Sequence, residues 1–371
     1  MEERLNHQAL LMGVGGPWTM KESPIPKPGP GQALIKMKAA SICNMTDLHT
    51  IQGYHPPHDH QFQGMIPHDV RMYLHKKNDP LAHLYPKHSY SDDVNPFPTL
   101  MGHEGMGEIV ELGPKLNYLL RSEDRGFKIG DRVGIFGLFG GLGEYVIADL
   151  DKLIVVPDNV IDEEAGLFEP VSILNAGTRK CVFLSNTVCI LGAGALGLLA
   201  VQFCKLRGAE KIIVSEPIAW KREMALKFGA THVIDPNAEN VTQVVEKITN
   251  GVGTDVVMEC AGFPETIQYL PYLVKRWGVI IQIGAGARPA LVDWDYIHFK
   301  HLRVEGQHYP MVPGPQGPVE MLTETMKIIG MGVLDLQSMI THRYAFSLEN
   351  VEKAFAEIEK GNVLKCSFHF E

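Results

Sequence analysis

One stretch of the chain, residues 188–216, constrains the fold more than any other. An apolar run leads into the sequence Gly-Ala-Gly-Ala-Leu-Gly at 192–197, and a helical pattern and a second apolar run follow. A strand, a glycine-rich turn, a helix and a strand in this order are typical of a parallel unit that binds a dinucleotide. Gly192 permits the tight turn, Gly194 leaves room for a pyrophosphate, and Gly197 lets the helix lie close to the sheet.

The residues beside this turn predict which dinucleotide binds. The helix that begins near Ala195 and Leu196 directs free backbone N–H groups at the pyrophosphate, so both residues join the predicted cofactor site. Glu216, at the carboxyl end of the second strand, can accept hydrogen bonds from both ribose hydroxyls of the adenosine and would repel a 2′-phosphate, which favours NAD over NADP. Lys221 and Arg222 follow closely and could instead neutralise such a phosphate.

Length and composition set further bounds. A chain of 371 residues is long enough for two domains, and 45% hydrophobic with 21% charged residues is typical of a globular protein. The net charge of −9 argues against nucleic acid or an anionic membrane as a partner. No apolar run reaches the length of a membrane span and the N-terminus lacks the apolar core of a signal peptide, so we expect a cytoplasmic protein.

Alternating strand and helix patterns continue after the glycine-rich unit. With its two strands, further strands at 232–235, 255–260, 279–283 and 302–305 make six. The segments on either side are richer in alternating β-strands and prolines. We therefore expect a six-stranded, doubly wound α/β Rossmann domain at 169–305, inserted in a β-rich domain built from 1–168 and 306–371.

Residues 54–98 interrupt the β-rich pattern with seven histidines among prolines, aspartates and tyrosines. A loop of this length inside a domain is usually functional, and histidine-rich tracts can bind metal. Only His58-Asp59-His60 has a spacing that suits ligands. Two interpretations stay open, a metal-binding arm or a surface insertion that covers a substrate cleft or contacts another subunit.

Three further segments are rich in side chains that bind metals or transfer protons. They are the run 41–49 with Cys43, Thr46, Asp47 and His49, the adjacent pair His103 and Glu104, and Glu169 before Pro170. A Pro-Asp-Asn sequence at 157–159 predicts the start of the helix that carries Glu169. The other cysteines form no CxxC pair, which is typical of reduced, buried thiols.

Taken together, the Cys43 loop, Gly-His-Glu at 102–104, Glu169-Pro170 and the late glycine-rich turn resemble the zinc-dependent medium-chain dehydrogenase/reductase family of the alcohol dehydrogenase superfamily. The polyol-dehydrogenase and threonine-dehydrogenase branches are the most similar. The resemblance covers nearly the whole chain apart from the histidine-rich insertion. It implies a GroES-like catalytic domain, a Rossmann domain, a cleft between them, and a homodimer or homotetramer.

The resemblance implies one catalytic zinc ion. Cys43 matches its thiolate ligand and His103 its imidazole ligand, while Glu104 or Glu169 supplies a carboxylate directly or through water. This set agrees with catalytic zinc, which takes about three N, S or O ligands and leaves a position for water or substrate. The four-cysteine lobe that holds structural zinc in many relatives is absent after Glu111, so we expect one zinc ion per subunit and no structural zinc.

A proton relay is also implied. Thr46 matches the hydroxyl that takes the alcohol proton and His49 a later carrier, and with Glu104 they form the expected catalytic set. The segment from Cys43 to Thr46 is one residue longer here than the family's usual Cys-Gly-Thr/Ser.

At the cofactor, Lys221 matches a lysine beside the adenosine ribose, and Lys365 a basic residue directed at the pyrophosphate. The resemblance implies the reversible oxidation of a polar secondary alcohol, of polyol or amino-alcohol type, to the ketone by hydride transfer to NAD. Two alternatives stay open: a zinc-independent NAD(P)H reductase of carbonyls or enones from the same superfamily, and a non-catalytic sensor that binds NAD or metal.

Overall fold

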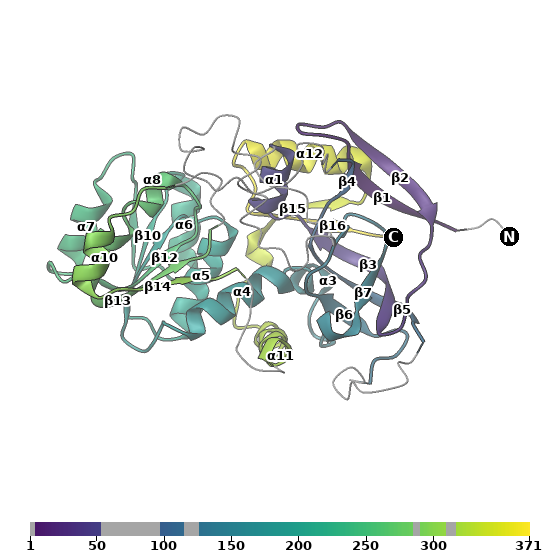
Figure 1. Ribbon diagram of the computed structural model, residues 1–371, viewed down its shortest axis with the longest axis horizontal. Coiled ribbons are helices and arrows are strands. Elements are labelled where there is room, and N and C mark those ends of the chain that lie inside the picture. Colours follow the sequence, from purple (N-terminus) through teal and green to yellow (C-terminus); the bar gives the residue numbers. More distant parts are fainter. Residues whose placement is uncertain (1–3, 53–96, 115–125, 285–289, 309–316) are drawn as a thin grey trace, which may run out of the picture. The chain divides into compact units, whose positions relative to one another are not determined.

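The computed structural model describes residues 4–52, 97–114, 126–284, 290–308 and 317–371 (Figure 1). The histidine-rich insertion predicted at 54–98 lies outside the described residues, except for Phe97 and Pro98. Contacts divide the chain into a first unit, Met1–Glu169 with Met326–Met331 and Leu336–Glu371, and a second unit, Pro170–Thr325 with Gly332–Asp335. The division expected from the sequence, with 169–305 inserted between 1–168 and 306–371, stays a prediction.

Among the described residues, a parallel sheet of six strands forms the centre of the second unit (Figure 1). In spatial order the strands are β11 (His232–Ile234), β10 (Lys211–Ser215), β9 (Thr187–Leu191), β12 (Thr254–Glu259), β13 (Val274–Gln282) and β14 (Arg303–Gly306). The doubly wound α/β fold and its six strands are thus confirmed. Chain order runs outward from β9 on one side and from β12 on the other, so the topological switch point lies between these two strands.

Helices connect these strands, and their ends follow the sequence signals. They are α5 (Ala195–Leu206), α6 (Ala219–Phe228), α7 (Val241–Ile248), α8 (Pro264–Ile267), α9 (Leu270–Leu273) and α10 (Trp294–Lys300). Gly229 ends α6 in the left-handed conformation, with φ at 118°. Asn240 caps α7, because its side-chain oxygen accepts a hydrogen bond from the N–H of Gln243.

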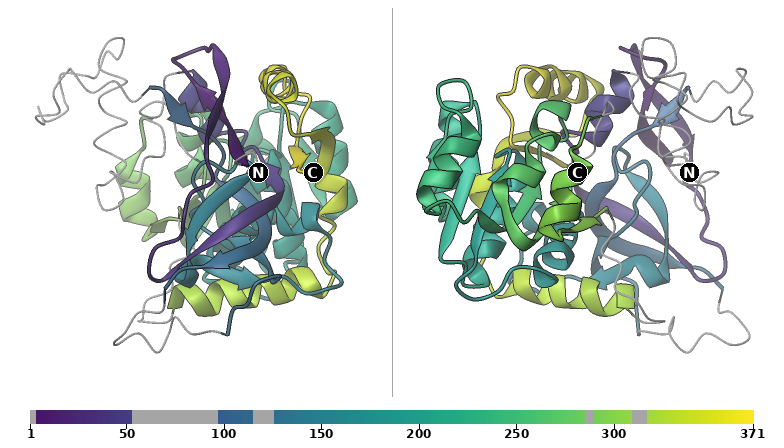
Figure 2. Two further views of the ribbon diagram at one scale, coloured as in Figure 1. Left: turned by 90° about the vertical axis from the view of Figure 1, so that its right-hand side faces the viewer. Right: turned by 60° about the vertical axis from the view of Figure 1, so that its left-hand side comes forward.

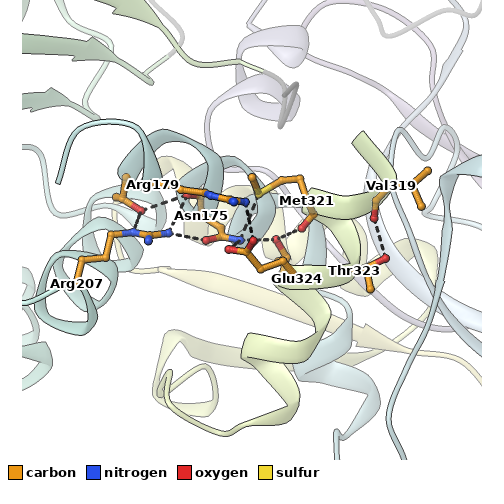
Figure 3. Close-up of polar contacts among 9 residues, drawn as sticks. Asn175, Arg179, Arg207, Val319, Met321, Thr323 and Glu324 are labelled. Atoms are coloured by element: carbon orange, nitrogen blue, oxygen red, sulfur yellow. Dashed lines mark hydrogen bonds and ion pairs between the residues drawn. The ribbon is translucent and has the colours of Figure 1, made fainter. Parts of the chain in front are cut away.

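A polar network of second-unit residues joins two further helices, α4 (Phe168–Arg179) and α11 (Gly317–Gly330), each of which also contributes a few residues to the first unit. Figure 3 shows Asn175 and Arg179 directed at α11, where Arg179 pairs with Glu324 at 2.6 Å. The guanidinium of Arg207, which follows α5, donates to the side-chain oxygen of Asn175 at 2.7 Å. The carboxyl-terminal half of α4 is therefore fastened both to α11 and to the end of α5.

The first unit is rich in β-structure, as predicted. Within the described residues it has a sheet in the order β15-β16-β3-β5-β6-β8, with β7 paired to β3, and a smaller sheet in the order β2-β1-β4. The strands are β1 (Leu5–Leu11), β2 (Trp18–Pro24), β3 (Gln32–Ser41), β4 (Thr99–Leu100), β5 (Glu104–Leu112), β6 (Arg132–Ile135), β7 (Tyr145–Asp149), β8 (Leu153–Val155), β15 (Ile340–Ala345) and β16 (Lys365–His369). Strand β16, from the C-terminus, pairs with β3, so both ends of the chain build this unit (Figures 1 and 2).

Short helices complete the first unit: α1 (Thr46–Ile51), α3 (Asp162–Ala165) and α12 (Leu348–Glu359). The prediction that a helix begins at residue 157 is wrong. Pro157 and Val160 form a turn, and helical structure starts at Asp162. The guanidinium of Arg132 binds the carbonyl oxygens of Pro157 and Val160, which a helix would need for its own hydrogen bonds. Among the described helices of the whole chain, none is long and apolar enough to cross a bilayer.

Candidate metal and cofactor sites

Three donor groups from two distant segments of the sequence meet in the first unit. Cys43 follows β3, and Glu104 begins β5 directly after His103. Antiparallel pairing of these strands places Ser41 opposite Glu104 and thereby brings the two segments together. The ligand atoms of Cys43, His103 and Glu104 lie within 4.8 Å of one another, the one such group of three found among the described residues.

Asp47, on the first turn of α1, connects two members of this group. One carboxylate oxygen accepts the backbone N–H of Cys43 at 2.9 Å, and the other lies 3.2 Å from Nδ1 of His103. Burial lowers the pKa of His103, but the charge and hydrogen bond of Asp47, with help from Cys43, outweigh it and hold the pKa well above its usual value. A carboxylate on Nδ1 leaves Nε2 as the nitrogen for a metal ion.

Thr46 and His49 share α1 with Asp47. The backbone N–H of Thr46 donates to Sγ of Cys43 at 3.4 Å, so the helix begins directly at the thiol. The Thr46 side chain is half-buried. The side chain of His49 lies outside the described part of the chain.

Glu104 forms a buried ion pair with Lys365. The Lys365 ammonium lies 2.5 and 2.6 Å from the two oxygens of Glu104 and donates to the carbonyl of Ile42 at 3.1 Å. Burial lowers the pKa of Lys365, and the charge of Glu104 more than offsets this, so its pKa lies above the usual value. We expected Lys365 to face the cofactor pyrophosphate, but these contacts use all three of its N–H donors.

Glu169, in the first turn of α4, is half-buried and feels the charges of this cluster. Removal from water raises the pKa of its carboxyl to about 7, and the charge of Glu104 adds to that rise, while those of His103 and Lys365 oppose it. Its oxygens do not belong to the group of three ligand atoms within 4.8 Å. Of the two predicted carboxylates, Glu104 is therefore the one that lies with Cys43 and His103.

The glycine-rich turn in the second unit has the shape that a dinucleotide needs. Gly192 has a φ of 93°, and a Cβ there would lie 2.9 Å from the Cβ of Ala261. A Cβ on Gly197 would lie 1.9 Å from the carbonyl oxygen of Gly192. With any other residue at position 197, the helix could not lie this close to the turn. Gly194, in contrast, faces open space, as expected where a ligand approaches, and α5 begins at the next residue without a side-chain cap.

The acidic residue after β10 is buried against this turn. One oxygen of Glu216 accepts the backbone N–H of Ala193 at 2.7 Å, and the other accepts that of Ile218 at 3.0 Å. Arg222 donates to the carbonyl of Glu216 at 2.7 Å and pairs with Asp235 at 2.9 Å. The guanidinium is therefore committed to its neighbours.

Lys221, the other basic residue of the predicted adenosine site, lies with its ammonium 5.5 Å from the ring centroid of Trp220. Partial burial lowers the pKa of Lys221, and the charge of Glu216 opposes this. The charges of Lys221 and Glu216 therefore interact near the end of β10.

Sequence reasoning assigned no role to Asp47, although it recognised that Asp47 stands in a run of ligand-type side chains. Its spacing of four residues from Cys43 was a usable signal, because the first turn of a helix can return a carboxylate to the residue before it. The local sequence gave no such signal for the ion-pair partners of Lys365 and Arg222, because these pairs form only through tertiary contacts.

The sequence and the fold are similar to those of known proteins. Residues 29–158 match the alcohol dehydrogenase GroES-like domain, and residues 195–324 match the zinc-binding dehydrogenase family. L-threonine 3-dehydrogenase of Pyrococcus horikoshii is 29% identical over 375 residues, which cover 94% of this chain and 93% of the relative.

Two solved structures show the same fold. A Sinorhizobium meliloti 1021 protein assigned to the zinc-binding dehydrogenases, solved with NADP, aligns with a TM-score of 0.75 at 24% identity over 99% of each chain. The 2R,3R-butanediol dehydrogenase of Bacillus subtilis aligns with a TM-score of 0.74 at 22% identity, covering 98% of this chain and 99% of its own.

Proposed function

The chain belongs to the zinc-type medium-chain dehydrogenases of the alcohol dehydrogenase superfamily, and on this premise we propose that it oxidises a polar secondary alcohol to the ketone with NAD. Members of this family are oxidoreductases that act on CH–OH groups with zinc and a nicotinamide cofactor. The observation that carries the proposal is the group of Cys43, His103 and Glu104, with ligand atoms within 4.8 Å. The threonine dehydrogenase relatives support an amino alcohol as the first substrate class to test, before polyols.

The donor atoms of the first unit fit a zinc ion. A thiolate sulfur, an imidazole nitrogen and a carboxylate oxygen form a set that catalytic zinc accepts. Asp47 adds the carboxylate that commonly holds a zinc-binding histidine in one tautomer and orientation. When bound, zinc would act as a Lewis acid that favours the alkoxide form of the substrate near neutral pH.

We propose Glu104 as the third ligand. Its carboxylate has about four lone-pair positions, so it can bind Lys365 and still offer an oxygen to a metal. Glu169 would then act through water. Zinc retention distinguishes the two residues: Glu104→Gln should lose zinc to a chelator at least about tenfold more readily than Glu169→Gln, and the reverse order would contradict the assignment.

We further propose that the Thr46 hydroxyl takes the alcohol proton, with the cofactor ribose and His49 as later carriers. The N–H of Thr46 on Sγ of Cys43 supports this role, because it holds the residue beside a ligand. Thr46→Val should therefore lower kcat and leave zinc content unchanged.

Two observations support NAD over NADP. The buried carboxylate of Glu216 would repel a 2′-phosphate, and Arg222, which could have neutralised that phosphate, is bound to Asp235. Nicotinamide supplies the hydride acceptor when the cofactor is bound.

The decisive experiment measures NADH or NADPH formation by purified protein with a panel of secondary alcohols, beginning with L-threonine, butane-2,3-diol and polyols. We expect turnover with NAD and about one zinc ion per chain. Cys43→Ala should lose both zinc and turnover, whereas Cys181→Ala, which removes a buried thiol of the second unit, should keep both.

Other results would support other functions. Full activity of Cys43→Ala on carbonyls or enones, with no zinc in the wild type, would indicate the zinc-independent reductase. Binding of NAD or metal without turnover of any alcohol would indicate a sensor. Either result would refute the proposal.

A further inference from the structure

A buried carboxylate that none of the proposed steps uses lies beside the switch point of the second unit. Glu259 is the last residue of β12 and has no exposed surface. In the sheet it stands next to Leu191, the last residue of β9, and next to Gln282, the last residue of β13. Glu259 thus occupies the row in which three strands end, the edge where open α/β sheets bind their ligands.

The carboxylate receives hydrogen bonds only from uncharged donors. One oxygen accepts the N–H groups of Ala261 and Gly262 at 3.0 and 2.8 Å and the hydroxyl of Thr266 at 2.8 Å. The other accepts the side-chain amide of Gln282 at 2.7 Å. No Lys, Arg or His among the described residues forms an ion pair with Glu259, and burial raises its pKa, which these hydrogen bonds oppose. The pKa of Glu259 thus lies above its usual value, although these donors favour the ionised form.

The same contacts join the residues that directly follow β12 and β13 at this edge of the sheet. The Gln282 amide also donates to the carbonyl of Gly284 at 2.7 Å, and the N–H of Gly284 donates to the carbonyl of Glu259 at 2.8 Å. A Cβ on Gly284 would lie 2.5 Å from a carboxylate oxygen of Glu259, and one on Gly192 would lie 2.9 Å from Ala261. Ala261 and Gly262, after β12, therefore lie against Glu259, and Ala261 also lies against the glycine-rich turn, while Gly284, after β13, lies against Glu259.

The direction of the cofactor follows from this arrangement. Glu216 lies on the β10 side of the glycine-rich turn, so the adenosine half of a bound dinucleotide belongs on that side. The nicotinamide half then extends to the other side of the switch point, toward the ends of β12 and β13. The nicotinamide ring is positively charged in NAD and neutral in NADH, whereas the pyrophosphate charge is the same in both.

We propose that Glu259 favours the oxidised over the reduced cofactor, because its buried negative charge attracts the nicotinamide ring only in the oxidised form, while its hydrogen bonds hold the residues directly after β12 and β13 in place. The inference rests on the proposed binding of NAD at the glycine-rich turn. Such a preference assists alcohol oxidation, since it weakens the retention of the NADH product relative to NAD.

Two substitutions remove the net charge in different ways. Glu259→Gln replaces the carboxylate with a neutral amide of the same shape. Gln282→Lys keeps the carboxylate and a donor to it but adds a compensating cation. Thr266→Val is the matched control, because it removes one donor to the same carboxylate and changes no charge. Isothermal titration calorimetry gives the Kd of NAD and of NADH for each protein, and circular dichroism checks its folding.

We expect the ratio of the Kd of NAD to that of NADH to rise about threefold or more in both charge variants and to stay within about twofold of wild type in Thr266→Val. An unchanged ratio in both folded charge variants would overturn the proposal. If Glu259→Gln does not fold, Gln282→Lys decides alone. Wild-type protein that binds neither NAD nor NADH would overturn the proposed function as well, which separates the two failures.

Discussion

The ion pair between Lys365 and Glu104 allows a quantitative test of how strongly the buried charges beside the proposed metal site depend on one another. Lys365→Met keeps most of the side-chain volume and removes the ammonium, which leaves Glu104, only 1% exposed, without a cationic partner. Breaking a buried pair in this way typically costs about 3–5 kcal/mol of the free energy of unfolding. Urea unfolding of the metal-free protein should therefore show Lys365→Met destabilised by about 3–5 kcal/mol at pH 7.

Two control variants test whether the loss of stability in Lys365→Met comes from the unpaired buried charge. Lys128→Met removes a lysine whose side chain is 79% exposed and should change the free energy of unfolding by less than about 0.5 kcal/mol. The double variant Lys365→Met with Glu104→Gln removes both charges and should recover most of the loss. A cost below about 1 kcal/mol at pH 7 would refute the reasoning.

Three further predictions concern single side chains. Asp47→Asn should weaken zinc binding about 10–100-fold in chelator competition, because His103 loses the carboxylate that orients it. Glu216→Gln should reduce the preference for NAD over NADP about tenfold in binding measurements, and an unchanged ratio would contradict its role. In metal-free protein, iodoacetamide should modify Cys43 first and zinc should protect it, since burial raises the pKa of thiols such as Cys189 to about 12. Mass spectrometry identifies the modified residue.

The parts of the fold that sequence predicted are those set by local chemistry. The six parallel strands were recognisable because apolar runs between turn residues determine them with little help from the rest of the chain. The glycine-rich turn was recognisable because Gly192 and Gly197 are required by close backbone contacts within a few residues. The helix expected at 157 failed for the opposite reason, since Arg132, 25 residues away, binds the carbonyls that the helix needed.

The candidate site also combines features that the sequence predicted with features that it could not predict. A resemblance of short motifs placed Cys43 and His103 together, and the pairing of β3 with β5 explains why. The partner of Lys365 was beyond such reasoning, because Glu104 lies 261 residues away and the two meet only through the order β16-β3-β5. A lysine near a glutamate in space leaves no mark in either local sequence, so the sequence could not reveal this ion pair.

The extra residue after Cys43 shows how the site tolerates a departure from the family pattern. The side-chain amide of Asn44 donates to the carbonyl oxygens of residues 363 and 364 at 3.0 and 2.8 Å, which ties the longer loop to the segment just before Lys365 and β16. Asp47 still accepts the N–H of Cys43, and its own N–H donates to the Cys43 carbonyl at 3.2 Å. Because Asp47 holds the cysteine from the helix side, the geometry of the ligand depends on these contacts more than on loop length. A substitution at Asn44 would therefore disturb Cys43 and Lys365 together, since one short segment anchors both the metal ligand and the charge that balances its neighbour.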